Sequence, residues 1–230
     1  MWRTDALQLL IAVMLDLSLG DPRGWPHVTR AAGGLTLFWE PLCSHIFGRT
    51  IVGGVILWFC VCATILSVYF LIRSALSIIH PSLSWIWDAV IIYQTLAARD
   101  LDRHARDVSA PLLLGDLHGA RQNVGMIVGR DTQHLDPVGI SRATIEAVAE
   151  STTDGFVAPL FWAYIGGAPA ALLYRTANTL DSIVGHRTEA YELMGKFSAI
   201  TDDVLGFIPA RICALASLLP RGFRHLSEVI

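Results

Sequence analysis

IVGGVILWFCVCATILSVYFLI, from Ile51 to Ile72, is a run of apolar and small residues without one charged side chain. At a rise of about 1.5 Å per residue, a helix over this run is long enough to cross the roughly 30 Å hydrocarbon core of a bilayer. The stretch therefore predicts a transmembrane helix, and the rest of the chain is interpreted around it.

The overall composition agrees with a membrane protein. Of the 230 residues, 53% are hydrophobic and only 16% are charged, whereas a typical soluble domain is about 25% charged. A net charge of −3 gives no general attraction to phosphate backbones, so we expect no nucleic-acid partner. The sequence also lacks a phosphate-binding G-x-x-x-x-G-K-[ST] loop and a dinucleotide glycine fingerprint, which excludes a conventional nucleotide-binding domain.

A second uncharged run, FVAPLFWAYIGGAPAALLY from Phe156 to Tyr174, contains Pro159, Gly166, Gly167 and Pro169. These residues predict a broken or kinked helix, which a membrane tolerates only where neighbouring protein satisfies the freed backbone groups. A kink that serves packing is favoured, and a break that exposes helix ends to a ligand is the alternative.

Three further apolar segments each contain a charged residue, namely Asp16, Asp88 and Arg211. A charge at mid-bilayer costs about 2.5–3.5 kcal/mol, so we expect Asp88 and Arg211 to face protein, water or an interface. The predicted fold class is an all-α, polytopic integral membrane protein that forms a single domain over residues 1–230. Its spans are predicted near residues 6–20, 51–72, 83–98, 156–174 and 204–219.

Residues 99–155 are too polar to enter lipid and predict a charged helical loop of three short helices. The first covers residues 99–110 and is closed by Pro111; the second covers 116–129, with Asp116 as its N-cap. The third opens at Asp136-Pro137, a capping acid followed by a proline at the first helical position, and ends near residues 153–155. This loop is expected to face water, on the cytoplasmic side.

Three acidic residues of the third loop helix, Glu146, Glu150 and Asp154, follow one another at i, i+4 and i+8. This spacing places three carboxylates on one helix face, where they repel one another. A divalent cation or a cationic substrate would turn that repulsion into attraction, and a solvated acidic stripe is the alternative. The stripe leads directly into the interrupted apolar run that starts at Phe156.

Polar residues also follow the interrupted run. Asn178 and Asp181 supply oxygen ligands of the kind that Mg²⁺ binds together with phosphate oxygens, and the flanking Arg175 and Arg187 could hold anionic oxygens. The polar turn around Arg130 and the acidic pair Asp202-Asp203 have a similar character. Many ionisable groups are thus predicted at the borders of apolar segments, where burial is expensive unless a function requires it.

The stretch GRDTQHLDPVGISRATIEAVAESTTDGFVAPLFWAYIGGAPAALLYRTANTLDSIVGHR, from Gly129 to Arg187, resembles the core of the CobD/CbiB family of cobalamin-biosynthesis membrane proteins. ARDLDRHA from Ala98 and DDVLGFIPAR from Asp202 match the same family in order. The resemblance implies a multi-pass protein of the cell (inner) membrane. Family members are longer, and we expect this chain to lack their C-terminal segment after Leu219.

The resemblance also implies an activity, that of an adenosylcobinamide-phosphate synthase. Such an enzyme joins aminopropanol or its phosphate ester to the propionate carboxyl of adenosylcobyric acid in an ATP-dependent amide ligation. The implied cofactors are Mg²⁺ and ATP as co-substrate. The implied partners are the corrinoid substrate, aminopropanol (phosphate), the lipid bilayer and other late cobalamin-pathway enzymes.

Such a ligation needs a metal and cationic groups to offset the charge of the transferred phosphoryl group, and a base for the amine. As hypotheses, the catalytic residues are Glu146, Glu150, Asp154 and Asp181, and the metal ligands are Glu150, Asp154 and Asp181. The substrate-binding residues are Arg130, Asn178, Arg187 and Arg211.

The chain departs from the family pattern at Ser151, His186 and Gly206, where the family usually has Asn, Tyr and Asn. Two other functions are therefore considered. One is a catalytically impaired membrane scaffold for the late corrinoid pathway. The other is a transporter, which the interrupted helix and the intramembrane acids would suit.

Overall fold

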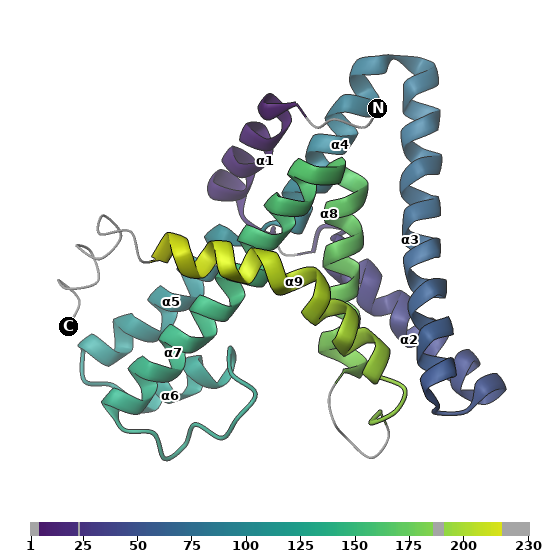
Figure 1. The fold of residues 1–230 in the computed structure, drawn as a ribbon. Helices are drawn as coiled ribbons and strands as arrows, with labels where there is room; N and C mark the ends of the chain where they lie inside the picture. Colours follow the sequence, from purple (N-terminus) through teal and green to yellow (C-terminus); the bar gives the residue numbers. More distant parts are fainter. Residues whose placement is uncertain (1–4, 23, 186–190, 218–230) are drawn as a thin grey trace.

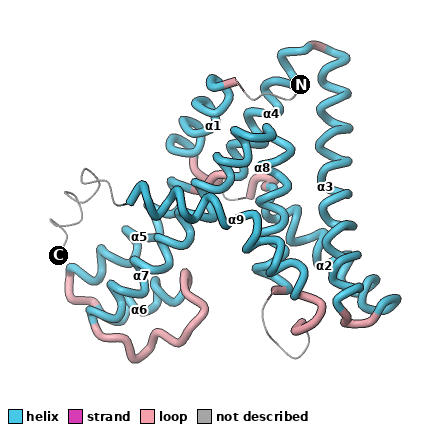
Figure 2. The backbone as a smooth tube through the Cα atoms, viewed as in Figure 1, coloured by secondary structure: helices cyan, strands magenta, loops and turns pink. Residues whose placement is uncertain are grey.

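The structure is a computed structural model that describes residues 5–22, 24–185 and 191–217, and this part of the chain is built from helices joined by loops and turns (Figures 1 and 2). The predicted all-α fold is confirmed for these residues. The helices are α1 (Ala6–Leu19), α2 (Val28–Phe47), α3 (Ile51–Ile79), α4 (Pro81–Thr95), α5 (Ala98–Leu113), α6 (Leu117–Gly125), α7 (Pro137–Thr152), a π-helical turn η1 (Thr153–Val157), α8 (Ala158–Val184) and α9 (Lys196–Ser217).

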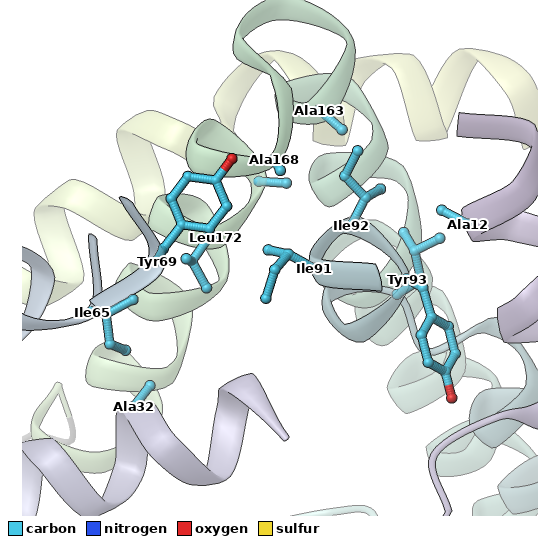
Figure 3. Packing of buried hydrophobic residues seen from close by; sticks show 12 residues of the cluster. Ala12, Ala32, Ile65, Tyr69, Ile91, Ile92, Tyr93, Ala163, Ala168 and Leu172 are labelled. Carbon is cyan, nitrogen blue, oxygen red and sulfur yellow. The ribbon is translucent and has the colours of Figure 1, made fainter. Parts of the chain in front are cut away.

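The helices form an apolar bundle and a smaller polar subdomain. In Figure 1, α3 stands as a long rod beside α2, α4 and α8, while α5, α6 and α7 gather at the lower left and α9 crosses the molecule. The bundle has one core between α1, α2, α3, α4 and α8, part of which is shown in Figure 3, and a second core between α2, α3 and α8. The subdomain has a core of its own, formed by Val108, Ala120, Val124, Ile140 and Ala143.

Two helical stretches of the described chain are long and apolar enough to cross a membrane, α3 and the continuous run Pro137–Val184. Much of α3 is not covered by protein. Leu71 is 72% exposed and Ile78 is 87% exposed, although a core helix of a soluble protein would bury such side chains. Exposed apolar rows of this kind suit a helix that faces lipid, so the structure supports a membrane protein.

The run Pro137–Val184 is folded back on itself at Gly167. This residue has φ 72° and ψ −165°, a conformation that is essentially restricted to glycine. The Tyr174 hydroxyl donates to Asp154 Oδ1 across 3.4 Å, although residues twenty apart in one straight helix would be separated by about 30 Å. In Figure 1 the green ribbon rises, reverses within α8 and descends. The expected break is confirmed, and residues 156–174 form a hairpin rather than one straight span.

The π-helical turn has a local cause in Pro159. Proline lacks an N–H group and clashes with the carbonyl four residues earlier in a regular helix. The chain widens just before this proline, and the Ala158 N–H donates to Thr153 O, five residues back. The α-helical part of the third loop helix ends at Thr152, close to the predicted end near residues 153–155, but the chain does not leave the helical path there, because η1 carries it onward into α8.

The two acidic residues within predicted spans have partners. Asp16 is 1% exposed, and its Oδ2 accepts the Ala98 N–H at 2.8 Å, which caps the start of α5. Asp88 of α4 accepts the Arg73 Nε–H at 3.0 and 3.1 Å through its two oxygens and the Tyr69 hydroxyl at 2.6 Å. Asp88 thus faces protein, as expected.

Other boundaries differ from the sequence expectations. Helix α2 was not predicted. The predicted segment 83–98 becomes α4 at residues 81–95, and α9 begins at Lys196, ahead of the predicted 204–219, of which residues 218 and 219 lie outside the described chain. Pro111 does not close α5, which continues to Leu113. The Asp107 carbonyl that Pro111 leaves without an N–H donor accepts instead from Asn123 Nδ2 of α6.

The Arg73–Asp88 pair predicts a stability difference between buried and exposed ion pairs. Asp88→Ala leaves the partly buried Arg73 without its carboxylate and is expected to cost about 3 kcal/mol of unfolding free energy. Asp102→Ala breaks the exposed Asp102–Arg106 pair and is expected to cost about 0.5 kcal/mol. Denaturation of the detergent-solubilised chain measures both values, and equal losses would contradict the interpretation.

The conformation of Gly167 gives a second prediction. Gly167→Ala places a Cβ atom where the backbone excludes it and is expected to destabilise the hairpin by about 1–3 kcal/mol. Gly34→Ala is the matched control, because Gly34 lies in helical α2 with open space around its Cα; this change should leave stability unchanged or raise it slightly. Thermal unfolding in detergent compares the two variants. A Gly167→Ala protein as stable as wild type would show that the reversal does not need glycine.

Candidate functional site

Two neighbouring cavities lie where the hairpin meets the polar subdomain and α9. The first has a volume of about 890 Å³ and reaches from α5 and α7 to α8. The second, of about 610 Å³, lies between α8 and α9. Both are lined by Glu150, Asp154, Asn178 and Ser182, so these side chains form a shared wall.

Helix α7 and η1 supply the acidic side of the first cavity. Asp136 caps α7 by accepting the Gly139 N–H at 2.7 Å, with Pro137 at the first turn, as predicted. From this start, the helical repeat brings Glu146, Glu150 and Asp154 to the first cavity. The structure thus gathers the three carboxylates that the spacing places on one face.

The returning arm of the hairpin supplies the opposite side. Besides the Tyr174 contact, Arg175 Nη1 donates to the main-chain oxygen of Asp154 at 3.3 Å. Asn178, one turn further along α8, lines both cavities. Residues on either side of the hairpin therefore meet around Asp154 because the chain reverses at Gly167.

Helix α9 adds a further carboxylate, Asp202. Its Oδ2 accepts the Asn178 Nδ2–H at 3.3 Å, while its Oδ1 is buried and has no hydrogen-bond partner. Burial, followed by the charge of Asp154, raises the pKa of Asp202 to about 7. The Trp162 indole, which donates to Leu205 O at 3.1 Å, ties α9 to the first arm of the hairpin.

The carboxylates of the second cavity bear on the predicted magnesium site, which stays a prediction. No group of three or more His, Cys, Asp or Glu side chains is close enough to hold a metal by itself within the described part of the chain. Magnesium, however, usually takes one or two carboxylates and completes its shell with water and phosphate oxygens. Glu150, Asp154, Asp181 and Asp202 all line the second cavity.

The remaining predicted residues lie at the edges of this region. Arg130 is exposed and pairs with Glu146 across 2.9 Å at the rim of the first cavity. Arg211 lines the second cavity, where its guanidinium donates to Phe207 O at 2.7 Å and lies over the Phe207 ring. Arg187 lies outside the described residues. The structure thus groups seven of the eight predicted side chains, whose chemical roles stay predictions.

Five charged or titratable lining residues were not among the assigned site residues: Asp100, His104, Arg175, Asp202 and Asp203. Of these, Arg175 was expected to be able to hold anionic oxygens, and Asp202-Asp203 was noted as an acidic pair at the border of an apolar segment. Asp100 and His104 belong to the ARDLDRHA segment, and Asp202 belongs to the acidic pair ahead of Pro209. These residues stand out in the sequence as charged groups within matching motifs. Only the hairpin and the crossing of α9, however, place them in the same region as Asp154. In the same way, the pairing of Asp202 with Asn178 follows from tertiary packing alone.

The pKa of Asp202 predicts a pH-dependent stability. A carboxyl whose pKa is raised from 3.8 to about 7 by folding binds its proton more tightly in the folded state. Its contribution to stability is complete below the unfolded pKa and is lost as the pH rises through about 7. Without added metal, the wild-type melting temperature should therefore fall more between pH 5 and pH 8 than that of Asp202→Asn, which cannot ionise. Asp107→Asn, at an exposed position that lines neither cavity, is the control and should follow wild type; identical pH profiles for all three proteins would contradict the assignment.

Comparison with known proteins identifies the family. The family model described as CobD/Cbib protein matches residues 9–228. The Citrobacter koseri protein named cobalamin biosynthesis protein CobD is 41% identical over 225 residues, which cover 94% of this chain and 70% of that protein. The Salmonella arizonae protein named cobalamin biosynthesis protein CbiB is 40% identical over 220 residues, covering 94% and 69%. No solved structure matches. The predicted resemblance is confirmed: the chain belongs to the CobD/CbiB family.

Proposed function

We propose that this protein acts in cobalamin biosynthesis as an amide-forming ligase of the adenosylcobinamide-phosphate synthase type. Its substrates would be adenosylcobyric acid, ATP and aminopropanol or its phosphate. The observation that carries the proposal is the cavity pair at the border of an apolar bundle, in which carboxylates of α5, α7, η1, α8 and α9 meet the guanidinium groups of Arg130, Arg175 and Arg211. The names of the relatives support the pathway.

The chemistry has two steps. An oxygen of the propionate carboxylate attacks the γ-phosphorus of ATP, which forms an acyl phosphate and releases ADP. The amine then attacks the acyl carbon, the C–O bond to phosphate breaks, and the proton lost by nitrogen passes to a base. Amide and inorganic phosphate are the products. A negatively charged carboxylate is a poor electrophile, so the first step is what makes the second possible.

The residues divide between these tasks. Glu146, Glu150, Asp154 and Asp181 line the region where an ammonium group would bind or lose its proton. When bound, Mg²⁺ would neutralise charge on the transferred phosphoryl group, with Glu150, Asp154 and Asp181 as its ligands. Asn178, Arg130, Arg187 and Arg211 would orient the substrates and hold their anionic oxygens.

A multi-pass location in the inner membrane completes the proposal. Helix α3 is long enough to span a bilayer, and exposed apolar residues also occur on α2 and α9, where Leu37 is 68% and Val204 is 67% exposed. The polar subdomain α5–α7 has its own core and would lie in the aqueous phase. A site at the border of these two parts could take a charged substrate from water.

Loss of one shared-wall carboxylate tests the proposal. Glu150→Gln keeps the side-chain shape but removes the charge, and it is expected to lower ATP-dependent amide formation about 100-fold or more. Asp107→Asn, an exposed acid of the polar subdomain away from both cavities, is the matched control and should keep wild-type activity. The measurement is conversion of adenosylcobyric acid to its amide by the purified chain in detergent. Corrinoid binding by wild type without ATP-dependent product would contradict the ligase and identify a scaffold.

A further inference from the structure

Arg175 occupies an unusual position for a charged side chain. It lies on the returning arm of the hairpin, lines the first cavity and is partly buried. A guanidinium is always charged in proteins and carries five N–H donors. One of these, on Nη1, donates to the main-chain oxygen of Asp154, whereas Nε is shielded from solvent and has no hydrogen-bond partner.

Two other guanidinium groups near the bundle and the first cavity bind carboxylates. Arg73 binds both oxygens of Asp88 through its Nε, and Arg130 pairs with Glu146 at the exposed rim of the first cavity. No ion pair within 4.0 Å joins Arg175 to a carboxylate among the residues that the structure describes. Burying a charged group whose hydrogen bonds are incomplete is costly, and a ligand that completes those hydrogen bonds would recover part of that cost.

We propose that Arg175 is the oxyanion anchor of the first cavity, and that it binds carboxylate or phosphoryl oxygens of a ligand through its free N–H groups. The guanidinium fork matches both kinds of oxyanion. This inference rests on the proposed function for the identity of the substrates, but the anion site itself can be measured without them.

The surroundings restrict how an anion can bind there. The same cavity is lined by four carboxylates, Asp100, Glu146, Glu150 and Asp154, which repel an anion that arrives alone. Arg175 therefore selects an oxyanion that brings a positive charge with it, either a bound metal ion or an ammonium group. Arg175 also joins the two sides of the hairpin through Asp154, so an anion on its guanidinium would lie beside the acidic wall where the amine is expected.

The test measures anion binding by the detergent-solubilised full chain. Thermal unfolding is followed with magnesium chloride in every sample, during titration with sodium pyrophosphate or sodium acetate against sodium chloride at matched ionic strength, and the shift in melting temperature gives an apparent Kd. Arg175→Gln should weaken binding about tenfold or more, because a charge-assisted pair is lost. Arg175→Lys keeps the charge without the fork and should fall in between. Arg106→Gln, on an exposed pair remote from both cavities, should bind as wild type does.

Each result decides the proposal. A response to pyrophosphate alone identifies a phosphoryl site, a response to acetate alone identifies a carboxylate site, and a response to both supports the shared chemistry. Wild-type affinity in Arg175→Gln, or no response to either anion in the wild-type protein, would overturn the proposal. If Arg175→Gln does not fold, Arg175→Lys is compared with Arg106→Lys by the same criterion.

The anchor and the ligase proposal can fail separately. Amide formation is measured in the same preparations with ATP, aminopropanol phosphate and adenosylcobyric acid. If the wild-type protein makes the amide and Arg175→Gln keeps its anion affinity, the anchor proposal is rejected and the ligase proposal stands. If anion binding depends on Arg175 but the protein forms no amide, the anchor proposal stands and the ligase proposal is rejected.

Discussion

The reversal of the chain at Gly167 is the constraint on which the rest of the site depends. It returns α8 alongside η1, so that Tyr174 and Arg175 reach Asp154, and it leaves Asn178 in position to meet Asp202 of α9. Only a residue without a side chain adopts this backbone conformation at little cost. Because of this reversal, the apolar run forms two antiparallel arms instead of one long straight helix, and the arms hold charged groups together at the edge of the apolar bundle.

The charges of this protein fall into two groups with different physical roles. Some are neutralised within the fold, as where Asp88 binds Arg73 and where Asp16 caps α5. Others, such as Arg175 and Asp202, remain incompletely paired beside cavities. Burial penalises an incompletely paired charge, and this contrast is why the second group, rather than the first, indicates a binding site.

Local signals predicted the parts of this structure that local chemistry determines. The capping residues Asp116 and Asp136 place the starts of α6 and α7 correctly, and the helical repeat predicts that Glu146 and Glu150 share a cavity. Two errors of the prediction have a tertiary cause. Helix α5 continues past Pro111 because Asn123 of α6 donates to the Asp107 carbonyl. Helix α2 was missed because it is stabilised by packing against α3 and α8. The sequence pattern predicts that the apolar run breaks near Gly167, but it does not predict the direction in which the chain turns. The proximity of Arg175 and Asp202 to Asp154 depends on that direction and therefore cannot be predicted from the sequence alone.

The hairpin also makes the site depend on the number of residues in each of its arms. Each helical residue advances the backbone by about 1.5 Å and rotates it by about 100°, so one residue added to or removed from either arm would swing Arg175 and Asn178 away from Asp154. Spacing between these positions is then as restricted as the identity of the side chains themselves. Exposed apolar residues along the two arms could be exchanged at little cost, but a homologous chain would share the site only if it kept the same count of residues from the π-helical turn to the guanidinium.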